Sequence, residues 1–302
     1  MSETLIPGVR RFNRTVTQRV GALNERFLAR DRPLGQARLL WEIGPEGRDV
    51  RSLRTELDLD SGYVSRLLRS LEEAGLVQVE AKDSDRRVRV ARLTHAGMAE
   101  HAVLDRRSDD LAASLLEPLS DSQRTRLVQA MGEVERLLTA GMVTVEMVDP
   151  ALPPARYCLE QYFRELNRRF DVGFDPSKSI PLDAGDLRPP GGLMLVATLR
   201  AEPIGCGALK LRADGPADLK RMWVAESARG LGLGRRLLTE LETHAAQHGA
   251  TRIRLETNRA LVEAIALYRS AGYREVDPFN DEPYAHHWFE KDLHPNNRRA
   301  AR

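Results

Sequence analysis

The chain has 302 residues, of which 42% are hydrophobic and 30% charged, and its formal net charge at pH 7 is +2. This length corresponds to about two domains. The small net charge excludes attraction of nucleic acid by the field of the whole protein, so such attraction must come from local patterning. Its only cysteines, Cys158 and Cys206, lack metal-site or disulfide spacing, and no apolar run is long enough to cross a bilayer. We therefore expect a cytoplasmic protein without a bound metal and without membrane partners.

Helical patterns dominate the first part of the chain. Apolar residues recur at helical spacing over 12–27 and 37–43, and Gly44-Pro45 ends the second pattern. A short third helix is expected over 50–57. After a turn, Ser61 is the predicted cap of a fourth helix, which ends at Gly75. Two short helices joined by a tight turn are typical of a helix-turn-helix.

A hairpin is expected next. Residues 76–80 and 88–93 alternate between apolar and polar, which predicts two strands. Their connection over 81–87 is polar and basic, as a wing that enters a DNA groove would be.

Three motifs make this half similar to the MarR family of winged-helix regulators. They are Leu71-Glu72-Glu73-Ala74-Gly75-Leu76-Val77, Asp83-Ser84-Asp85-Arg86-Arg87 and Leu93-Thr94-His95-Ala96-Gly97, in the order of the family. The resemblance implies contacts to double-stranded DNA from the recognition helix, through Ser61, Tyr63, Ser65, Arg66 and Arg69, and from the wing tip, through Arg86 and Arg87. Asp85 could orient one of the wing guanidinium groups. The alternative for Arg66 and Arg69 is a solvated helix surface on which they pair with Glu72 or Glu73.

Two further amphipathic helices are expected over 111–119 and 127–138, separated by Pro118. The MarR resemblance implies that they build a homodimer, which would bind an inverted-repeat operator. The alternative is that they only complete a monomeric core. Strand-like alternation from Met142 places the predicted boundary at Ala140-Gly141, which gives domains 1–140 and 141–302.

Strands and helices are mixed in the second half. A hairpin of strands over 193–199 and 204–211 is predicted to turn near Glu202-Pro203, and further strands are predicted over 219–224, 253–257 and 285–292. A helix over 261–271 is closed by Gly272.

A glycine-punctuated turn follows the third of these strands and opens a helix. It reads Arg229-Gly230-Leu231-Gly232-Leu233-Gly234-Arg235. Its glycines let the backbone approach a ligand, and the free amides of a nascent helix attract a diphosphate. The flanking Arg229 and Arg235 could add contacts to phosphate oxygens. The alternative is a plain helix start made of small residues.

This turn, together with a second motif, resembles the GCN5-related N-acetyltransferase (GNAT) superfamily. The second motif is Ala264-Ile265-Ala266-Leu267-Tyr268-Arg269-Ser270-Ala271-Gly272-Tyr273. The resemblance implies an α/β (α+β) fold with a mixed, mostly antiparallel sheet, acetyl-CoA as the acetyl donor, and an amine that attacks the thioester directly. The chain as a whole is then a mainly α winged helix-turn-helix domain followed by a GNAT domain.

The GNAT resemblance also implies site residues. Met222, Trp223 and Val224 would line the pantetheine, the turn from Arg229 to Arg235 would bind the diphosphate, and Tyr268 would be the general acid. Tyr268 could instead simply pack, and Asn258 could contact pantetheine or cap the following helix. Asp218 corresponds to the family's base position, with Glu226, Glu256, His286 and His287 as further candidates.

The acceptor amine is not identified by any motif. Residues 163–179 and 278–284 are expected to select it, and Glu160, Glu165 or Asp171 could attract a cation. The predicted function is a regulator that is also an acetyltransferase. The alternatives are a regulator with a non-catalytic acetyl-CoA or ligand sensor, and an acetyltransferase whose helical half serves only for dimerisation.

Overall fold

The computed structural model describes residues 5–22, 28, 31–82, 85–212 and 215–293. Its internal contacts divide the chain into two compact units, Met1–Ala130 and Met131–Arg302. Helix α6 (Asp121–Met142) runs through the predicted boundary at Ala140-Gly141, and the chain becomes extended only at β4 (Thr144–Met147). The domain limits 1–140 and 141–302 stay a prediction.

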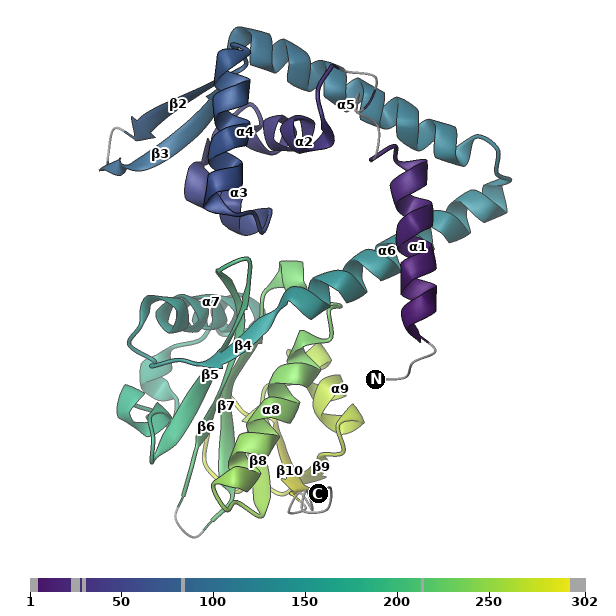
Figure 1. Ribbon diagram of the computed structural model, residues 1–302. Coiled ribbons are helices and arrows are strands. Elements are labelled where there is room, and N and C mark those ends of the chain that lie inside the picture. Colours follow the sequence, from purple (N-terminus) through teal and green to yellow (C-terminus); the bar gives the residue numbers. More distant parts are fainter. Residues whose placement is uncertain (1–4, 23–27, 29–30, 83–84, 213–214, 294–302) are drawn as a thin grey trace, which may run out of the picture. The chain divides into compact units, whose positions relative to one another are not determined.

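The first unit is mainly helical, as predicted (Figure 1). Its complete helices are α1 (Leu5–Arg19), α2 (Leu34–Ile43), α3 (Val50–Glu56), α4 (Ser61–Glu73) and α5 (His95–Leu116). The pattern over 12–27 overestimates the first helix, which ends at Arg19, and residues 23–27 lie outside the described residues.

The cap of α4 differs from the prediction. Asp60, not Ser61, is the N-cap, and its carboxylate accepts hydrogen bonds from the amides of Gly62 (2.9 Å) and Tyr63 (3.1 Å). Ser61 is already helical, because the Asp60 side chain reaches these two amides from one position earlier. The α4 side chains Val64, Leu67, Leu68 and Leu71 are buried as predicted.

The hairpin after α4 belongs to a small antiparallel sheet. Its strands are β1 (Arg48–Asp49), β2 (Val77–Lys82) and β3 (Asp85–Leu93), in the order β1-β3-β2. Strand β1 was not predicted, since two residues cannot show an alternation. The strands of the hairpin extend further toward the tip than predicted.

The second unit contains a seven-stranded sheet of order β4-β5-β6-β7-β8-β10-β9. The strands besides β4 are β5 (Gly192–Leu199), β6 (Glu202–Lys210), β7 (Ala217–Val224), β8 (Arg252–Thr257), β9 (Arg274–Val276) and β10 (His287–Asp292). Among the strand pairs of the described residues, only β7–β8 is parallel. The sheet is therefore mixed and mostly antiparallel, as predicted.

Three details of this sheet differ from the prediction. The β5–β6 hairpin turns at Arg200 and Ala201, which have positive φ of 52° and 66°, while Glu202 already begins β6. Two consecutive residues of positive φ match the twist of a tight hairpin, and Pro203 is accommodated at a register shift. The last strand, β10, begins at His287 rather than at 285, and the short strand β9 was missed.

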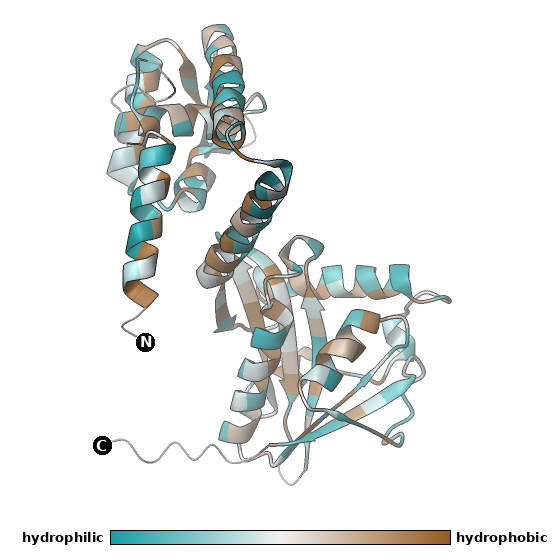
Figure 2. Cartoon of the chain, turned by 90° about the vertical axis from the view of Figure 1, so that its right-hand side faces the viewer, coloured by the Kyte–Doolittle hydropathy of each residue, from teal (hydrophilic) through white to brown (hydrophobic). Residues whose placement is uncertain are grey.

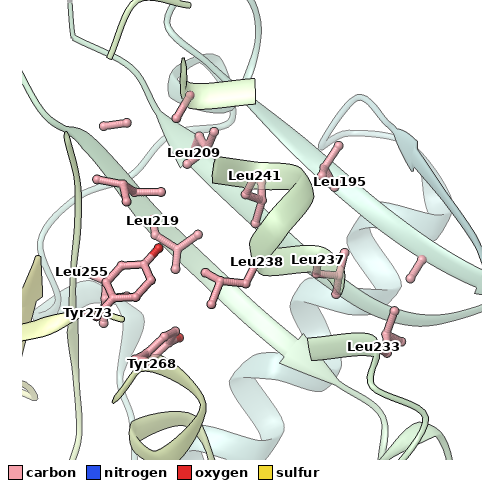
Figure 3. Packing of buried hydrophobic residues seen from close by; sticks show 14 of the residues in the cluster. Leu195, Leu209, Leu219, Leu233, Leu237, Leu238, Leu241, Leu255, Tyr268 and Tyr273 are labelled. Carbon is pink, nitrogen blue, oxygen red and sulfur yellow. The ribbon is translucent and has the colours of Figure 1, made fainter. Parts of the chain in front are cut away.

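Helices cover both faces of the sheet. Leu193 and Leu195 of β5 pack into one cluster with α8 (Leu233–Gln247) and α9 (Val262–Ser270), whereas Met194 and Val196 pack against α7 (Pro153–Arg169). This follows from the period of two along a strand. Figure 2 shows hydrophobic residues gathered along these strands, and Figure 3 shows the leucines of α8 lying against the sheet with Tyr268 and Tyr273 beside them.

Candidate functional site

Strands β7 and β8 form a fork. They pair only through Ala217 with Ile253 and Asp218 with Arg254, and no further ladder pair joins the described remainder of the two strands. Side chains rather than backbone bonds therefore line the opening between them. We call this opening the fork.

A bulge shapes β7 at the fork. The register of the β6–β7 pair shifts between Cys206 and Ala208, and Arg221 on the opposite strand has a positive φ of 57°. The Cys206 thiol donates to the Arg221 carbonyl over 3.2 Å. A bulge locally frees backbone groups and re-aims side chains, so Arg221 and Met222 are placed by this irregularity.

The glycine turn links β7 through a 3-10 turn, η4 (Glu226–Ala228), to α8. Gly230 and Gly232 have positive φ of 83° and 73°, and Gly232 is the N-cap of α8. The first backbone bond into the helix is from the Arg236 amide to the Gly232 carbonyl (3.1 Å), so the preceding amides of the first turn are not used by the helix. A Cβ at Gly234 would lie 3.3 Å from Leu267. This backbone suits an anion such as a diphosphate.

A cavity of about 370 Å³, here called the fork cavity, and one of about 550 Å³, called the turn cavity, meet at the fork. The predicted donor-binding residues that line the turn cavity are Met222, Trp223, Val224, Arg229, Gly230, Gly232, Leu233, Gly234 and Arg235. Leu231 instead packs against the core, and Asn258 lines the fork cavity. The predicted donor-binding residues are thus brought together with these two exceptions.

The two arginines of the turn have protein partners. Arg229 donates to Glu165 over 2.7 Å, and Arg235 donates to the Ser270 hydroxyl over 2.6 Å. Glu165 also accepts from the Trp223 indole (3.0 Å) and from Arg169 (3.2 Å). Glu165, expected as a group that attracts a cationic substrate, is therefore already neutralised by two guanidinium groups.

Tyr268 lines both cavities. Only 5% of its surface is exposed, and its ring packs 5.7 Å from that of Tyr273 (Figure 3). Burial raises the pKa of Tyr268 well above its ordinary value, and the charges of Tyr162 and Glu256 add to the rise. Tyr268 is packed in the core and also lines the junction of the two cavities. A packing role and a role as general acid are therefore compatible.

Asp218 is held at the closed end of the fork. One carboxylate oxygen accepts from Arg254 (2.6 Å) and the other from Arg212 (2.8 Å). Both carboxylate oxygens are therefore occupied by guanidinium donors. Its assignment as the base stays a prediction, but these contacts do not favour it.

Glu256 lies within the fork, two residues beyond the last β7–β8 pair on β8. Its carboxylate pairs with Lys220 and accepts from the Asn280 amide (3.3 Å). Its side chain is 10% exposed and lines the fork cavity. Glu226, His286 and His287 line neither cavity.

Asn258 makes the contacts of a structural residue. Its carbonyl accepts from the Ala260 amide (2.9 Å) and its amide donates to the Tyr284 carbonyl (2.7 Å). It therefore fixes the turn before α9, which begins at Val262, and ties it to the loop near Tyr284.

Sequence reasoning missed the contribution of α7. Tyr162 and Leu166 line both cavities, one helical turn apart. The signal was present, because aromatic and apolar residues recur at helical spacing from Cys158 to Phe170. Burial raises the pKa of Tyr162, and the neighbouring Arg221 guanidinium opposes that rise.

The five residues of α4 that were predicted to contact DNA are exposed in the first unit. Exposed side chains on α4 are Ser61, Tyr63, Ser65, Arg66 and Arg69. Arg66 lies over the Tyr63 ring at 5.7 Å, and among the described residues neither Arg66 nor Arg69 has a carboxylate at ion-pair distance. Glu72 instead accepts from the Val79 amide (3.2 Å). The alternative in which these arginines pair with Glu72 or Glu73 is therefore not what the structure contains.

The wing is only partly described. Residues 83–84 and the side chain of Arg86 lie outside the described residues, while Arg87 is exposed. Asp85 accepts from the Arg87 amide (3.0 Å), so in this structure its carboxylate orders the backbone at the tip.

Comparison with known proteins agrees with this geometry. The model of the Acetyltransferase (GNAT) family matches residues 159–273, and the model of the MarR family matches residues 31–88. A protein named IAA acetyltransferase in Azospirillum brasilense is 34% identical over 132 residues, which are 43% of this chain and 85% of that protein. The chain belongs to the GNAT acetyltransferase family, and its residues 31–88 match the MarR family. We call residues 1–130 the MarR unit and residues 131–302 the GNAT unit.

Further similarities concern the GNAT unit. An uncharacterized N-acetyltransferase of Schizosaccharomyces pombe is 33% identical over 97 residues, which are 32% of this chain and 60% of that protein. A crystal structure of an acetyltransferase of the GNAT family from Staphylococcus aureus Mu50 is similar with a TM-score of 0.43 and 18% identity, over 50% of this chain and 100% of that one. The GNAT unit is an N-acetyltransferase-type domain, fused to a MarR-type regulator domain.

Two kinds of feature are absent from the described residues. No helix among them is sufficiently long and apolar to span a membrane. No three His, Cys, Asp or Glu side chains in the described part of the chain gather as a metal site requires.

Proposed function

We propose that this MarR–GNAT fusion transfers the acetyl group of acetyl-CoA to an amine, and that it binds an inverted-repeat operator as a homodimer. One observation carries the enzymatic part: two cavities, one beneath a free helix N-terminus and one lined by polar groups, share a wall at Tyr268. A donor and an acceptor that enter from these two sides would meet at the fork.

The turn cavity suits acetyl-CoA. The amides around Gly232 and Gly234 would bind the diphosphate. The edge of β7 at Met222, Trp223 and Val224, which does not pair with β8, would lie along the pantetheine. Bound acetyl-CoA supplies a thioester at the junction of the cavities. Arg229 and Arg235 could turn from Glu165 and Ser270 toward phosphate oxygens.

Acetyl transfer also requires one proton to leave the amine and one to reach the departing sulfur. An amine attacks only when neutral, and Glu256 lies where it can accept its proton, directly or through water. Tyr268 stays protonated because its pKa is raised, so its hydroxyl can donate to the departing sulfur. Asp218 would hold Arg212 and Arg254 at the closed end of the fork.

The MarR unit would read DNA through α4 and the wing. Arg66 and Arg69 are exposed without carboxylate partners among the described residues, which leaves them available for guanine edges or phosphates. Exposed apolar side chains on α1 and on the part of α6 within this unit suit a dimer interface: Leu5, Ile6, Val9, Phe12, Val16 and Val128.

Thiol release from acetyl-CoA with a panel of small amines tests the enzymatic proposal. Amine-dependent release supports transfer, whereas acetyl-CoA binding without release would favour the sensor. Operator affinity is then measured with and without acetyl-CoA. A sensor should bind DNA with a different affinity when acetyl-CoA is bound, whereas a fusion of two uncoupled domains should not. No binding to any DNA would leave dimerisation as the role of the MarR unit.

A further inference from the structure

The side chains that line the fork cavity carry an excess of positive charge. Its lining contains five cationic and three acidic side chains: Lys210, Arg212, Lys220, Arg221 and Arg254, against Asp218, Glu256 and Glu282. Lys210 pairs with Asp186, which lies outside the lining (3.1 Å). An uncharged or purely cationic ligand would leave this excess of positive charge in place.

The acidic groups are already engaged. Asp218 accepts from Arg212 and Arg254, and Glu256 pairs with Lys220. Glu282 accepts from the Ser179 hydroxyl (2.8 Å) and the Ile180 amide (2.9 Å).

Arg221 is the exception among the lining cations. It has no carboxylate at ion-pair distance within the described residues, and it is half-buried. Its guanidinium lies instead over the rings of Phe163 (4.8 Å) and Tyr162 (5.6 Å). The Tyr162 side chain also accepts a hydrogen bond from Arg221. Neither the aromatic faces nor this hydrogen bond neutralises the guanidinium, so its charge and its remaining donors are available to an anion.

The wall of the fork cavity away from β7 is aromatic. Phe174 packs 4.9 Å from Tyr284 and 5.9 Å from Phe170, and all three rings line the cavity. Such a wall suits an apolar side chain. A volume of about 370 Å³ is at the small end of ligand pockets, which favours a free small molecule over a folded protein surface.

We propose that the acceptor is a free amino acid with an apolar side chain, whose carboxylate is bound by Arg221. This inference rests on the proposed acetyl transfer. Arg221 and Met222 are consecutive, and Met222 lines both cavities, so a carboxylate at Arg221 places a nearby amine at the junction with Tyr268. The amine nitrogen forms the new amide bond as the thioester C–S bond breaks. Glu256 accepts the amine proton, and the sulfur leaves as the thiol with a proton from Tyr268.

Paired substrates test the proposal in the full chain. L-phenylalanine and L-leucine are compared by thiol release with their decarboxylated counterparts, phenethylamine and isopentylamine. We expect kcat/KM for the amino acids to be about 100-fold higher than for the amines, because only the former pair with Arg221. Equal or faster acetylation of the decarboxylated amines overturns the proposal.

Variants of Arg221 make the test specific. Arg221→Gln keeps a Cβ at the bulge and so leaves its backbone strain unaltered. We expect it to raise KM for the amino acids about 100-fold, and so to abolish the preference for amino acids over decarboxylated amines, with unchanged acetyl-CoA affinity. Arg221→Lys restores part of the loss. Arg156→Gln, an exposed arginine of α7 that lines neither cavity, is the matched control and should resemble the wild type.

Failure of the proposed function is separable from failure of this inference. If no amine supports thiol release, calorimetry with L-phenylalanine and phenethylamine is carried out on the CoA-bound chain. Binding of the amino acid alone, lost in Arg221→Gln, supports the carboxylate site without catalysis. Absence of binding, or equal binding of both ligands, overturns it.

Discussion

Asp218 of β7 accepts a 2.6 Å hydrogen bond from Arg254 of β8, at the last residue pair through which the two strands run side by side. The ion pair thus closes the end of the fork. Beyond it the strands separate and Glu256, the next residue of β8 on the same face, reaches the cavity. Arg254, which closes the fork through Asp218, and Glu256, which lines the cavity, are therefore adjacent on the same face of β8.

Removing the charge of Asp218 should destabilise the GNAT unit. Asp218→Asn leaves Arg254, with 19% of its side chain exposed, without its anion, and we expect a loss of about 2 kcal/mol in the free energy of unfolding, since Arg212 is half-exposed. Urea unfolding in a Trp41→Phe background follows Trp223 and Trp288, which report the GNAT unit alone. An unchanged stability together with abolished turnover would return Asp218 to the role of base.

Glu256→Gln should remove the proton acceptor. We expect kcat to fall about 100-fold, with acetyl-CoA affinity unchanged. Glu202→Gln, an exposed carboxylate at the start of β6, is the control. A Glu256→Gln enzyme with wild-type turnover would exclude this residue as the base.

Gly232→Ala should weaken donor binding through the backbone. A φ of 73° disfavours residues with a Cβ, so a loss of about 1 kcal/mol in stability and a weaker affinity for acetyl-CoA are expected. Gly132→Ala, inside α6 with open space around it, should instead be neutral or stabilising by up to about 1 kcal/mol. Thermal unfolding and calorimetry give both quantities. Wild-type acetyl-CoA affinity in Gly232→Ala would argue against the turn as the diphosphate site.

Arg66→Ala and Arg69→Ala should reduce operator affinity. If each contacts a phosphate, the slope of log K against log salt should fall by about 1 per substitution, whereas a base contact should relax sequence preference at one position. Fluorescence anisotropy with the operator at several salt concentrations distinguishes these outcomes. Arg38→Ala, which removes an arginine paired with Glu42 on α2, is the control. Retained affinity in both α4 variants would contradict the recognition surface.

The sequence was most informative where a short motif determines local geometry. The alternation of glycines predicted the turn, because residues at positive φ before a helix are restricted to very few types. The periodicity of α4 likewise predicted which side chains are buried.

Contacts between residues that are distant in the sequence could not be predicted from local motifs. Nothing adjacent to Asp218 reveals that Arg254, 36 positions away, occupies its carboxylate. The bulge at Arg221 was equally hidden, since it depends on the register against Cys206 and on no local signature. The proposed role of Glu256 depends on these two features, so the sequence suggested this residue as one candidate among several but did not select it.

We propose that Tyr268 completes acetyl transfer where the two cavities meet. This role is tested by amine-dependent thiol release with the wild type, Tyr268→Phe and Tyr273→Phe, with acetyl-CoA affinity measured in parallel. Because the raised pKa keeps Tyr268 protonated, its ionisation should cause no loss of wild-type activity up to about pH 10. We expect a loss of about 100-fold in kcat for Tyr268→Phe, near-wild-type turnover for Tyr273→Phe, which lines neither cavity, and unchanged donor affinity in both. Acetyl-CoA binding without amine-dependent release by the wild type, or full turnover by Tyr268→Phe, would contradict this role.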